Sequence, residues 1–249
     1  MPGCVVSPAV DSTLPVSARL AWWGTAWLRG RVSPDDLIDA VLDGDVTHLV
    51  SSGPLLAALA AQRDAGATGW GAAFPREGAA VGLGGPAPFN TAAIDAGEAV
   101  VAVGAEAGWV PRRVGPTVEW TAYPAARRQV PDVGEADREL RATLLTAADA
   151  LAELDVARWR PDVADELLDL RGLTVPKSPP GVPDRCAELA ARGLQALGIA
   201  DLALADDGGA LSAAAAEQRR AAIMPLDLAG RRALVAACSP EAWPPEPPA

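Results

Sequence analysis

The chain has 249 residues, 50% of them hydrophobic, and its 21 Lys+Arg against 32 Asp+Glu give a net charge of −11. This apolar content excludes a disordered protein, and the acidic balance argues against a nucleic-acid partner, because an acidic chain gains nothing from counterion release on DNA. No apolar run is long enough to span a bilayer, and the first residues lack the basic flank and apolar core of an export signal, so we expect a cytoplasmic protein with no membrane partner.

The first elements are a leader and a tryptophan-rich helix. Residues 1–16 contain prolines and no sustained period, so we expect them to form a flexible leader. Residues 17–30 are expected to form a short helix in which Trp23 and Trp27 share one stripe, whereas Trp22 points away from it. These indoles either pack on a sheet, which we favour, or form an aromatic platform for a flat ligand or a protein partner. On the second interpretation the partner-binding residues are Trp22, Trp23 and Trp27.

The next segment predicts helix, strand and helix. Ser33-Pro34-Asp35-Asp36 combines an N-cap, a proline at the first helical position and two acids at the positive helix end, so a helix should run to about Leu42. Residues 46–50 alternate as a short strand, and residues 54–63 are helical. Together with the strand that follows, this order suggests a right-handed parallel crossover.

The strand over residues 68–74 has one bulky and one bare face. Trp70 lies on the bulky face, whereas Gly69 and Gly71 leave the other face nearly without side chains, which lets a helix, another chain or a ligand come close. The strand over residues 99–103 is apolar on both faces, so we expect it to be the most buried strand.

The glycine-rich loop of residues 78–90 is a candidate ligand site. Its backbone donors and the helix that we expect to begin at Asn90 could hold an anion. It lacks the lysine and hydroxyl pair of a P-loop, and Pro86 breaks the dinucleotide fingerprint, so we favour an ordinary irregular loop. The candidate ligand-binding residues are Gly82, Gly84, Gly85 and Asn90, with Arg112 and Arg113 added for the anionic group.

A basic island follows on a predicted hairpin. Residues 109–114 and 117–123 read as two strands closed near Gly115-Pro116, and Pro111, which lacks a ladder donor, indicates an edge strand. Between Glu106 and Asp132 the only acid is Glu119. The arginines could contact an acidic partner or an anion, or they could protect a sheet edge from aggregation, and we leave both interpretations open. The partner-binding candidates are Arg112, Arg113, Arg127 and Arg128.

From residue 131 the period becomes helical. We expect helices over about 135–154, 160–170, 184–205, 212–225 and 227–238, with a bend in the third of these near Gly193 and Gly198. A proline-rich tail, residues 240–249, should be extended or disordered, although it could also serve as a docking tail. One carboxylate stripe could gather Mg²⁺, but a solvated helix face gives the same spacing and is the interpretation that we favour. The stripe consists of Asp162, Asp165, Glu166 and Asp169.

Side chains that move protons or form covalent intermediates are scarce, with one His, one Tyr and one Lys in the chain. His48 would need a serine or thiol and a carboxylate to form a triad, and no Gly-x-Ser-x-Gly elbow supplies the nucleophile, so we interpret His48 as structural. A centre built from several histidines is excluded. Cys4, Cys186 and Cys238 show no paired spacing, so we expect neither a disulfide framework nor a zinc site.

Two stretches carry a family resemblance. Ala-Trp-Trp-Gly-Thr-Ala-Trp-Leu-Arg-Gly at residues 21–30 and Gly-Leu-Gly-Gly-Pro-Ala-Pro-Phe-Asn at residues 82–90 lie in a chain rich in Ala, Gly, Pro and Arg. In this the chain resembles uncharacterised conserved proteins of the actinobacterial type. The resemblance implies no activity and supplies no catalytic residues.

The sequence therefore predicts an α+β protein. We expect a small mixed β-sheet with flanking helices over residues 17–130 and a helical subdomain over residues 131–239. The function that we favour is a non-catalytic intracellular binding or regulatory protein that acts through protein–protein contacts, with a homodimer as one arrangement. The alternative is a protein or enzyme that binds a small anionic ligand in a pocket at the loop of residues 78–90. We expect no catalytic residues, no cofactor and no metal.

Overall fold

A computed structural model describes residues 14–51, 53–153, 174–205 and 213–244. In the N-terminal half, six strands form one mixed sheet in the order β2-β1-β6-β5-β4-β3. The described C-terminal half is helical, so the predicted α+β class is confirmed. The strands are β1 (Thr47–Val50), β2 (Gly53–Pro54), β3 (Gly69–Ala73), β4 (Ala99–Val103), β5 (Ala107–Val114) and β6 (Thr117–Pro124).

The strand pairing corrects the predicted crossover. β1 pairs in parallel with β6, whereas β3 pairs antiparallel with β4, so β1 and β3 lie far apart in the sheet. The prediction of a parallel crossover between these two segments was wrong. The strand order explains the error: the β5–β6 hairpin and β4 lie between β1 and β3, so these two strands are not neighbours in the sheet.

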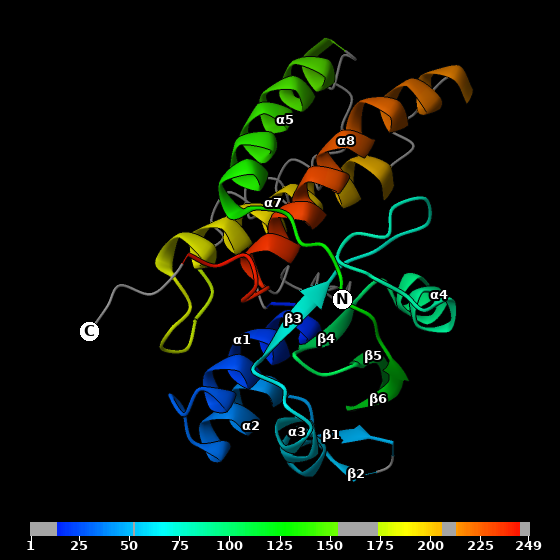
Figure 1. Cartoon of the computed structure of the whole chain (residues 1–249). Helices are drawn as coiled ribbons and strands as arrows, with labels where there is room; N and C mark the ends of the chain where they lie inside the picture. Colours follow the sequence, from blue (N-terminus) through cyan, green and yellow to red (C-terminus); the bar gives the residue numbers. More distant parts are fainter. Residues whose placement is uncertain (1–13, 52, 154–173, 206–212, 245–249) are drawn as a thin grey trace, which may run out of the picture.

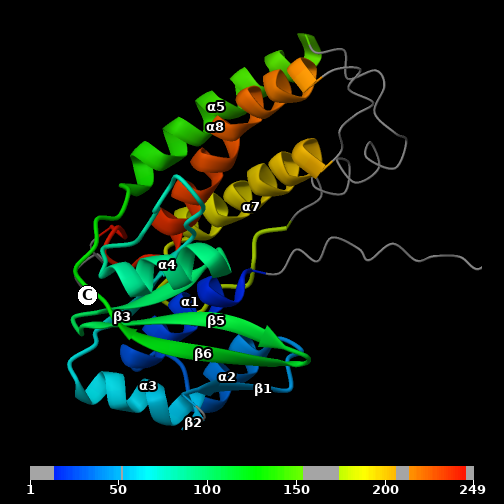
Figure 2. The same cartoon turned by 90° about the vertical axis from the view of Figure 1, so that its right-hand side faces the viewer.

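Helices cover both faces of the sheet (Figures 1 and 2). On one face lie α1 (Val16–Leu28), α2 (Pro34–Leu42) and α3 (Leu55–Asp64), and their apolar side chains join the main core with Trp70, Trp109 and Trp120 of the sheet. On the opposite face, α4 (Ala87–Ala96) buries Phe89 in a second, smaller core. The sheet is therefore closed on both sides by helices from its own half of the chain.

The tryptophans of α1 belong to the core. Twelve of the 13 residues of α1 are buried, among them all three indoles. Trp22 is fully buried and donates its indole N–H to the Ala237 carbonyl at 3.1 Å. The three indoles therefore pack in the core, as the favoured interpretation of the sequence predicted, and only 8% of Trp23 and 9% of Trp27 stay exposed, because an indole gains most by burying its large apolar area. A role of Trp22, Trp23 and Trp27 in partner binding stays a prediction.

The start of α2 follows the predicted cap. Ser33 and Asp36 form a reciprocal capping box, and Pro34 occupies the first turn. The helix ends at Asp43, whose φ of 43° is left-handed. This tight ending holds Asp43 beside α1, where it becomes part of the site described below.

The β5–β6 hairpin is confirmed, but the edge position that Pro111 predicted for the first of its strands is not. β5 lies between β4 and β6, so Pro111 is not on an edge strand. It is tolerated there because β4 pairs with β5 only through Val100↔Trp109 and Val101↔Gly108, which leaves the β4-facing side of Pro111 without a strand to bond. β5 therefore extends beyond the end of β4.

β3, and not β4, is the strand with every residue buried. It is an edge strand of the sheet, and the C-terminal segment covers its free side: the Ala72 N–H donates to the Cys238 carbonyl at 2.9 Å. Ala242 N–H then bonds back to the Ser239 carbonyl, and Trp243 donates to Ala237. Residues 240–243 are therefore folded against the core, which corrects the prediction of an extended tail for this part.

The C-terminal helices pack against one another beside the sheet (Figures 1 and 2). They are α5 (Val133–Glu153), α7 (Asp184–Ala205) and α8 (Ala213–Ala237). α8 runs through Pro225, so the predicted break there was wrong, because packing against α5 and α7 holds both sides of the proline in one helix. The glycine predicted to bend α7, Gly193, instead allows close approach, since a Cβ there would lie 3.1 Å from the Gly230 carbonyl of α8.

The helix predicted at 160–170 with its carboxylate stripe lies outside the described residues, as do residues 1–13 of the predicted leader, residue 212 of the predicted helix at 212–225 and residues 245–249 of the predicted tail. In the part of the chain that the structure describes, no helix has the length and apolar character needed to cross a membrane.

Candidate functional site

Arg128, one of the predicted surface arginines, lies buried at the free edge of β3. All five of its N–H groups donate: Nη1 to the carbonyls of Ala72 (2.7 Å) and Gly82 (3.1 Å), Nη2 to Ser239 Oγ (2.9 Å), and Nε and Nη2 to the Glu241 carboxylate (3.1 and 3.3 Å). The prediction that Arg128 binds a partner was therefore wrong, because every donor is used within the chain.

The bare face of β3 makes room for this arginine. A methyl group on Gly71 would overlap Nη2 of Arg128, and a Cβ on Gly84 would lie 2.6 Å from the Arg127 carbonyl. The prediction of a close approach at the glycines is thus confirmed, and the approaching group is a side chain of the same protein.

The glycine-rich loop is held by the same contacts. α4 begins at Ala87, so Asn90 lies inside the helix and is not its cap; its Oδ1 accepts a hydrogen bond from the Gly85 N–H at 3.0 Å. Gly82 packs against Ala73 and gives its carbonyl to Arg128. The loop uses these groups for its own structure, and the arginines predicted to share a ligand with it bond elsewhere.

The remaining arginines of the basic island have separate environments. Arg112 donates to Glu119 at 2.6 Å on the exposed side of the hairpin, and Arg113 forms an ion pair with Asp45. Arg127 is exposed. The four arginines therefore do not form one basic surface, and two of those exposed are neutralised by carboxylates.

Arg19 of α1 is the centre of a buried polar cluster that sequence reasoning missed. Its side chain is 9% exposed, with Nη1 2.9 Å from Asp43 Oδ2 and Nη2 3.4 Å from Asp45 Oδ2. Asp45 also accepts from Arg113 of β5 and lies 3.1 Å from His48 Nε2. Burial alone would raise the pKa of Asp45, but the hydrogen bonds from Arg113 and His48 outweigh it and lower that pKa. The Nε of Arg19 is buried and has no hydrogen-bond partner.

His48 is neutral and structural in this cluster. Its desolvation lowers the pKa more than the neighbouring Asp45 raises it. With Nε2 on Asp45, the other nitrogen, Nδ1, faces the indole N–H of Trp120 at 3.4 Å. Both ring nitrogens are therefore occupied by groups other than a serine or a thiol, so His48 has no nucleophile to activate.

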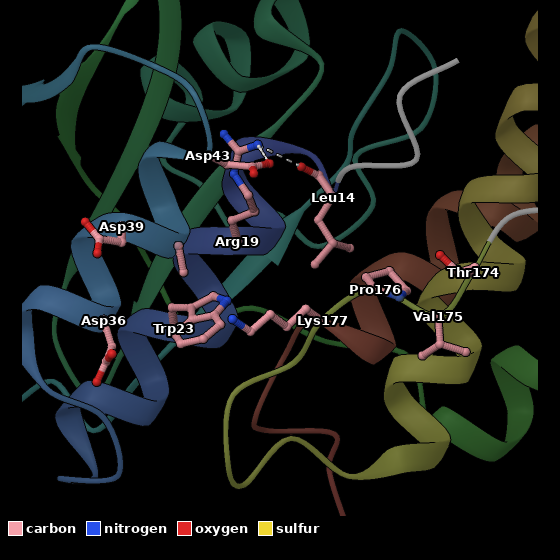
Figure 3. Close-up of a pocket in the computed structure, with 11 residues that line it drawn as sticks. Leu14, Arg19, Trp23, Asp36, Asp39, Asp43, Thr174, Val175, Pro176 and Lys177 are labelled. Atoms are coloured by element: carbon pink, nitrogen blue, oxygen red, sulfur yellow. Dashed lines mark hydrogen bonds and ion pairs between the residues drawn. The ribbon is translucent and has the colours of Figure 1, made fainter. Parts of the chain in front are cut away.

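A cavity of about 480 Å³, which Arg19 also lines, opens between α1, α2 and the segment of residues 174–177 (Figure 3). Arg19 and Trp23 form the part of its lining that comes from α1, and carboxylates of α2 lie along another wall. Its polar and aromatic lining consists of Arg19, Trp23, Asp36, Asp39, Asp43, Thr174 and Lys177.

Lys177 points into this cavity. Its Nζ lies 5.8 Å from the centre of the Trp23 ring, within cation–π range, and Figure 3 shows the lysine reaching across from the 174–177 segment to the indole. The hydrogen bonds of Ser33 are the main cause that lowers the pKa of Asp36, and the charge of Lys177 contributes in the same direction. A cation of this chain thus already lies beside the aspartates of α2.

A second cavity, of about 380 Å³, lies where β5 extends beyond β4 at the start of α1. Arg19 and Arg113 both line it, together with Glu98. One carboxylate oxygen of Glu98 accepts the Ser17 N–H at 2.9 Å, so this acid occupies the positive end of α1. Burial raises the pKa of Glu98.

The aspartates that line this cavity follow a pattern in the sequence that the overall composition did not reveal. Between Arg31 and Arg63 the chain contains five aspartates and no lysine or arginine. Asp36 and Asp39 lie three residues apart on α2, and Asp43 is the residue that ends this helix. Within the described residues, no three His, Cys, Asp or Glu side chains are placed to hold a metal ion.

These features define an α+β protein with a sheet half, a helical half and an acidic cavity that contains an aromatic ring. A family model for the Rv1486c-like protein N-terminal domain matches residues 17–135, and one for the Rv1486c-like protein C-terminal domain matches residues 134–235. The chain therefore belongs to the Rv1486c-like protein family, which confirms the resemblance seen in the sequence. No curated protein and no solved structure matches the chain. The division into 17–130 and 131–239 stays a prediction.

Proposed function

We propose that this protein is a non-catalytic binding protein that captures a basic segment of a protein partner on the acidic face of α2. The observation that carries the proposal is the cavity that Asp36 and Asp39 of α2, its C-cap Asp43 and Trp23 line together, and in which a lysine is already present. Carboxylates beside an indole face suit an ammonium or guanidinium group, which gains both ion pairing and cation–π attraction.

The charge distribution supports a basic partner. The chain has a net charge of −11, and α2 carries Asp35, Asp36 and Asp39 with no lysine or arginine of its own, which gives a negative field over this helix. Such a field raises the association rate of a cationic partner. The hairpin arginines would instead favour an acidic partner, but Arg112 and Arg113 are already paired with Glu119 and Asp45.

The chemistry around His48 supports a role without catalysis. The single histidine is buried between Asp45 and Trp120, and its lowered pKa keeps it neutral at physiological pH. Burial also raises the pKa of the Cys186 thiol to about 11, which keeps it in the unreactive thiol form.

Binding of a small anion is the second candidate, and the observation in its favour is that Arg19 and Arg113 line one cavity. Asp43 and Asp45 already neutralise these arginines, and Glu98 occupies the helix end, so the cavity has little positive charge to offer. A thermal-shift screen with phosphate, citrate and nucleotides tests it: stabilisation by a ligand that is lost in Arg113→Gln would support this candidate over the first.

We also propose a cytoplasmic location, and we retain the homodimer as a second arrangement. The two described cysteines, Cys186 and Cys238, are buried free thiols, which suits a reducing compartment. Cell fractionation tests the location, and sedimentation of the purified chain tests the homodimer.

Fluorescence anisotropy with two labelled peptides tests the main proposal. One peptide carries four arginines alternating with alanine, and the other carries glutamates in their place. We expect the basic peptide alone to bind, and Asp39→Lys to weaken it about tenfold or more by reversing one charge in the cavity.

Asp95→Lys is the matched control, because Asp95 is an exposed aspartate in the last turn of α4, on the opposite face of the sheet. It should change the affinity by less than about threefold, since exposed charges beyond a Debye length are screened. Equal losses from both variants, or binding of the acidic peptide, would contradict the proposal.

A further inference from the structure

We propose that the cavity at Trp23 is a single-cation subsite that Lys177 fills in the free protein, and that a lysine or arginine side chain of the partner binds there by displacing Lys177. This inference rests on the proposed function and names both the group that is recognised and the step that precedes its binding.

The first argument is the match between the cavity and its occupant. Trp23 is 8% exposed, so its ring presents one accessible part, and that part faces Lys177. Asp39 and Asp43 line the same cavity and are exposed. With Lys177 and Arg19 counted against three aspartates, the lining keeps an excess of one negative charge, and it would gain another if Lys177 left.

The second argument is how weakly the occupant's segment is attached. Within the described part of the chain, residues 174–178 make no hydrogen bond. Val175 is 52% exposed, so it does not anchor the segment in the core. The first buried residue after Lys177 is Pro179. The cation–π contact of Lys177 with Trp23 is thus a main attachment of this segment, and an exposed contact of this type is weak.

The third argument is that Lys177 is the only lysine of the chain. The remaining basic side chains are arginines, many of which are committed to ion pairs such as those of Arg19 and Arg128. A tethered competitor acts at a high effective concentration, so it lowers the apparent affinity for a partner even though its own contacts are weak. The partner's cation must therefore bind in the cavity more favourably than Lys177 does.

The closing experiment uses the single lysine as a reporter. Protein labelled with ¹³C-lysine gives the signals of one side chain, and a lysine over an indole face should show upfield-shifted ε-methylene protons. Asp39→Lys would add a second lysine signal. The variant for this experiment is therefore Asp39→Asn, with Asp95→Asn as its control. The shift should move toward the free-lysine position in Asp39→Asn only, and also when the arginine peptide is titrated in. Free-lysine shifts in the unmodified protein, or shifts that stay unchanged while the peptide binds, would overturn the inference.

Affinity measurements separate this inference from the proposed function. Lys177→Gln removes the competitor, so the arginine peptide should bind about twofold to fivefold more tightly, the range of one exposed cation–π contact. Lys177→Arg keeps the cation and should leave the affinity within about twofold. If Lys177→Gln has no effect while Asp39→Lys still abolishes binding, the displacement step is wrong and the proposed function stands. If Asp39→Lys has no effect, the proposed function itself fails.

Discussion

Arg128 and Arg19 are both buried arginines that join distant parts of the chain, but their environments differ. Arg128 donates through all five N–H groups to Ala72, Gly82, Ser239 and Glu241. Arg19 bonds to Leu14, Asp43 and Asp45, and its buried Nε has no partner.

The two arginines also differ in how far other parts of the chain enclose them. Backbone of β3, the glycine loop and the C-terminal turn enclose Arg128, whereas Arg19 lines two cavities. A guanidinium whose donors are all used stabilises the fold and offers nothing to a ligand. Arg19 has more open surroundings than Arg128, because it lines two cavities and one of its donors has no partner, and the following variants test this difference.

Arg128→Ala should have the largest effect. It removes the cation from a buried pair with Glu241 and leaves the Ala72 and Gly82 carbonyls without their donor. We expect a loss of about 3–5 kcal/mol in the free energy of unfolding, measured by urea denaturation. Arg127→Ala is the control and should change it by less than about 0.5 kcal/mol, because Arg127 is exposed. Similar values for the two variants would mean that Arg128 does not hold the β3 edge.

Gly71→Ala should rank second. The added methyl group would overlap Nη2 of Arg128, so the guanidinium must shift and lose hydrogen bonds; we expect a loss of about 1–3 kcal/mol. In an Arg128→Ala background the same change should cost much less, since the group that it displaces is gone. A double-mutant cycle with no coupling would contradict the close packing of these two residues.

The third test concerns His48, which lies in the Arg19 cluster. Because its folded pKa is lowered below 6.5 by burial, the unfolded chain takes up the proton first, and stability falls as the pH drops below about 6.5 toward the folded pKa. His48→Gln should remove this loss, so that unfolding free energy declines less between pH 7 and pH 5 than in the unmodified protein, by on the order of 1 kcal/mol.

Glu98→Gln gives the opposite control for the same pH series. The pKa of Glu98 is raised by burial, so in the folded state the proton is retained above pH 4.5, and this group makes the protein more stable as the pH falls. Glu98→Gln removes this contribution, so the free energy of unfolding should fall more steeply as the pH drops than in the unmodified protein. Identical pH profiles for both variants would show that neither group is buried as described.

The elements with a strong local signal were predictable from the sequence. The capping box at Ser33, the hairpin closed at Gly115-Pro116 and the α+β division all follow from residues that are close in the chain. The bare face of β3 also predicted a close approach, but not its partner, because Arg128 follows Gly71 by more than fifty residues and nothing local links them.

The candidate site could not be predicted in the same way. Its lining combines Trp23 of α1, Asp39 of α2 and Lys177, and only the tertiary fold brings these three together. Charge reasoning singled out the arginines of the hairpin, but it could not show that Asp45, more than sixty residues away, pairs with Arg113. The aspartates between Arg31 and Arg63 were a second charge signal, but the sequence could not show that Asp43 and Asp45 pair with arginines from other elements either.

Arg112→Glu should have the smallest effect and bears directly on the other interpretation of the surface. The Arg112 side chain is 73% exposed and pairs with the exposed Glu119, so the change should alter the free energy of unfolding by about 1 kcal/mol or less. The affinity for the arginine peptide should stay within about threefold, since Arg112 does not line the cavity of Trp23. If the variant instead loses an interaction with the glutamate peptide, the hairpin is the binding surface and an acidic partner must replace the basic one. Measuring both peptides on Arg112→Glu and Asp39→Lys therefore decides between the hairpin and α2, because each variant reverses one charge on only one of the two surfaces.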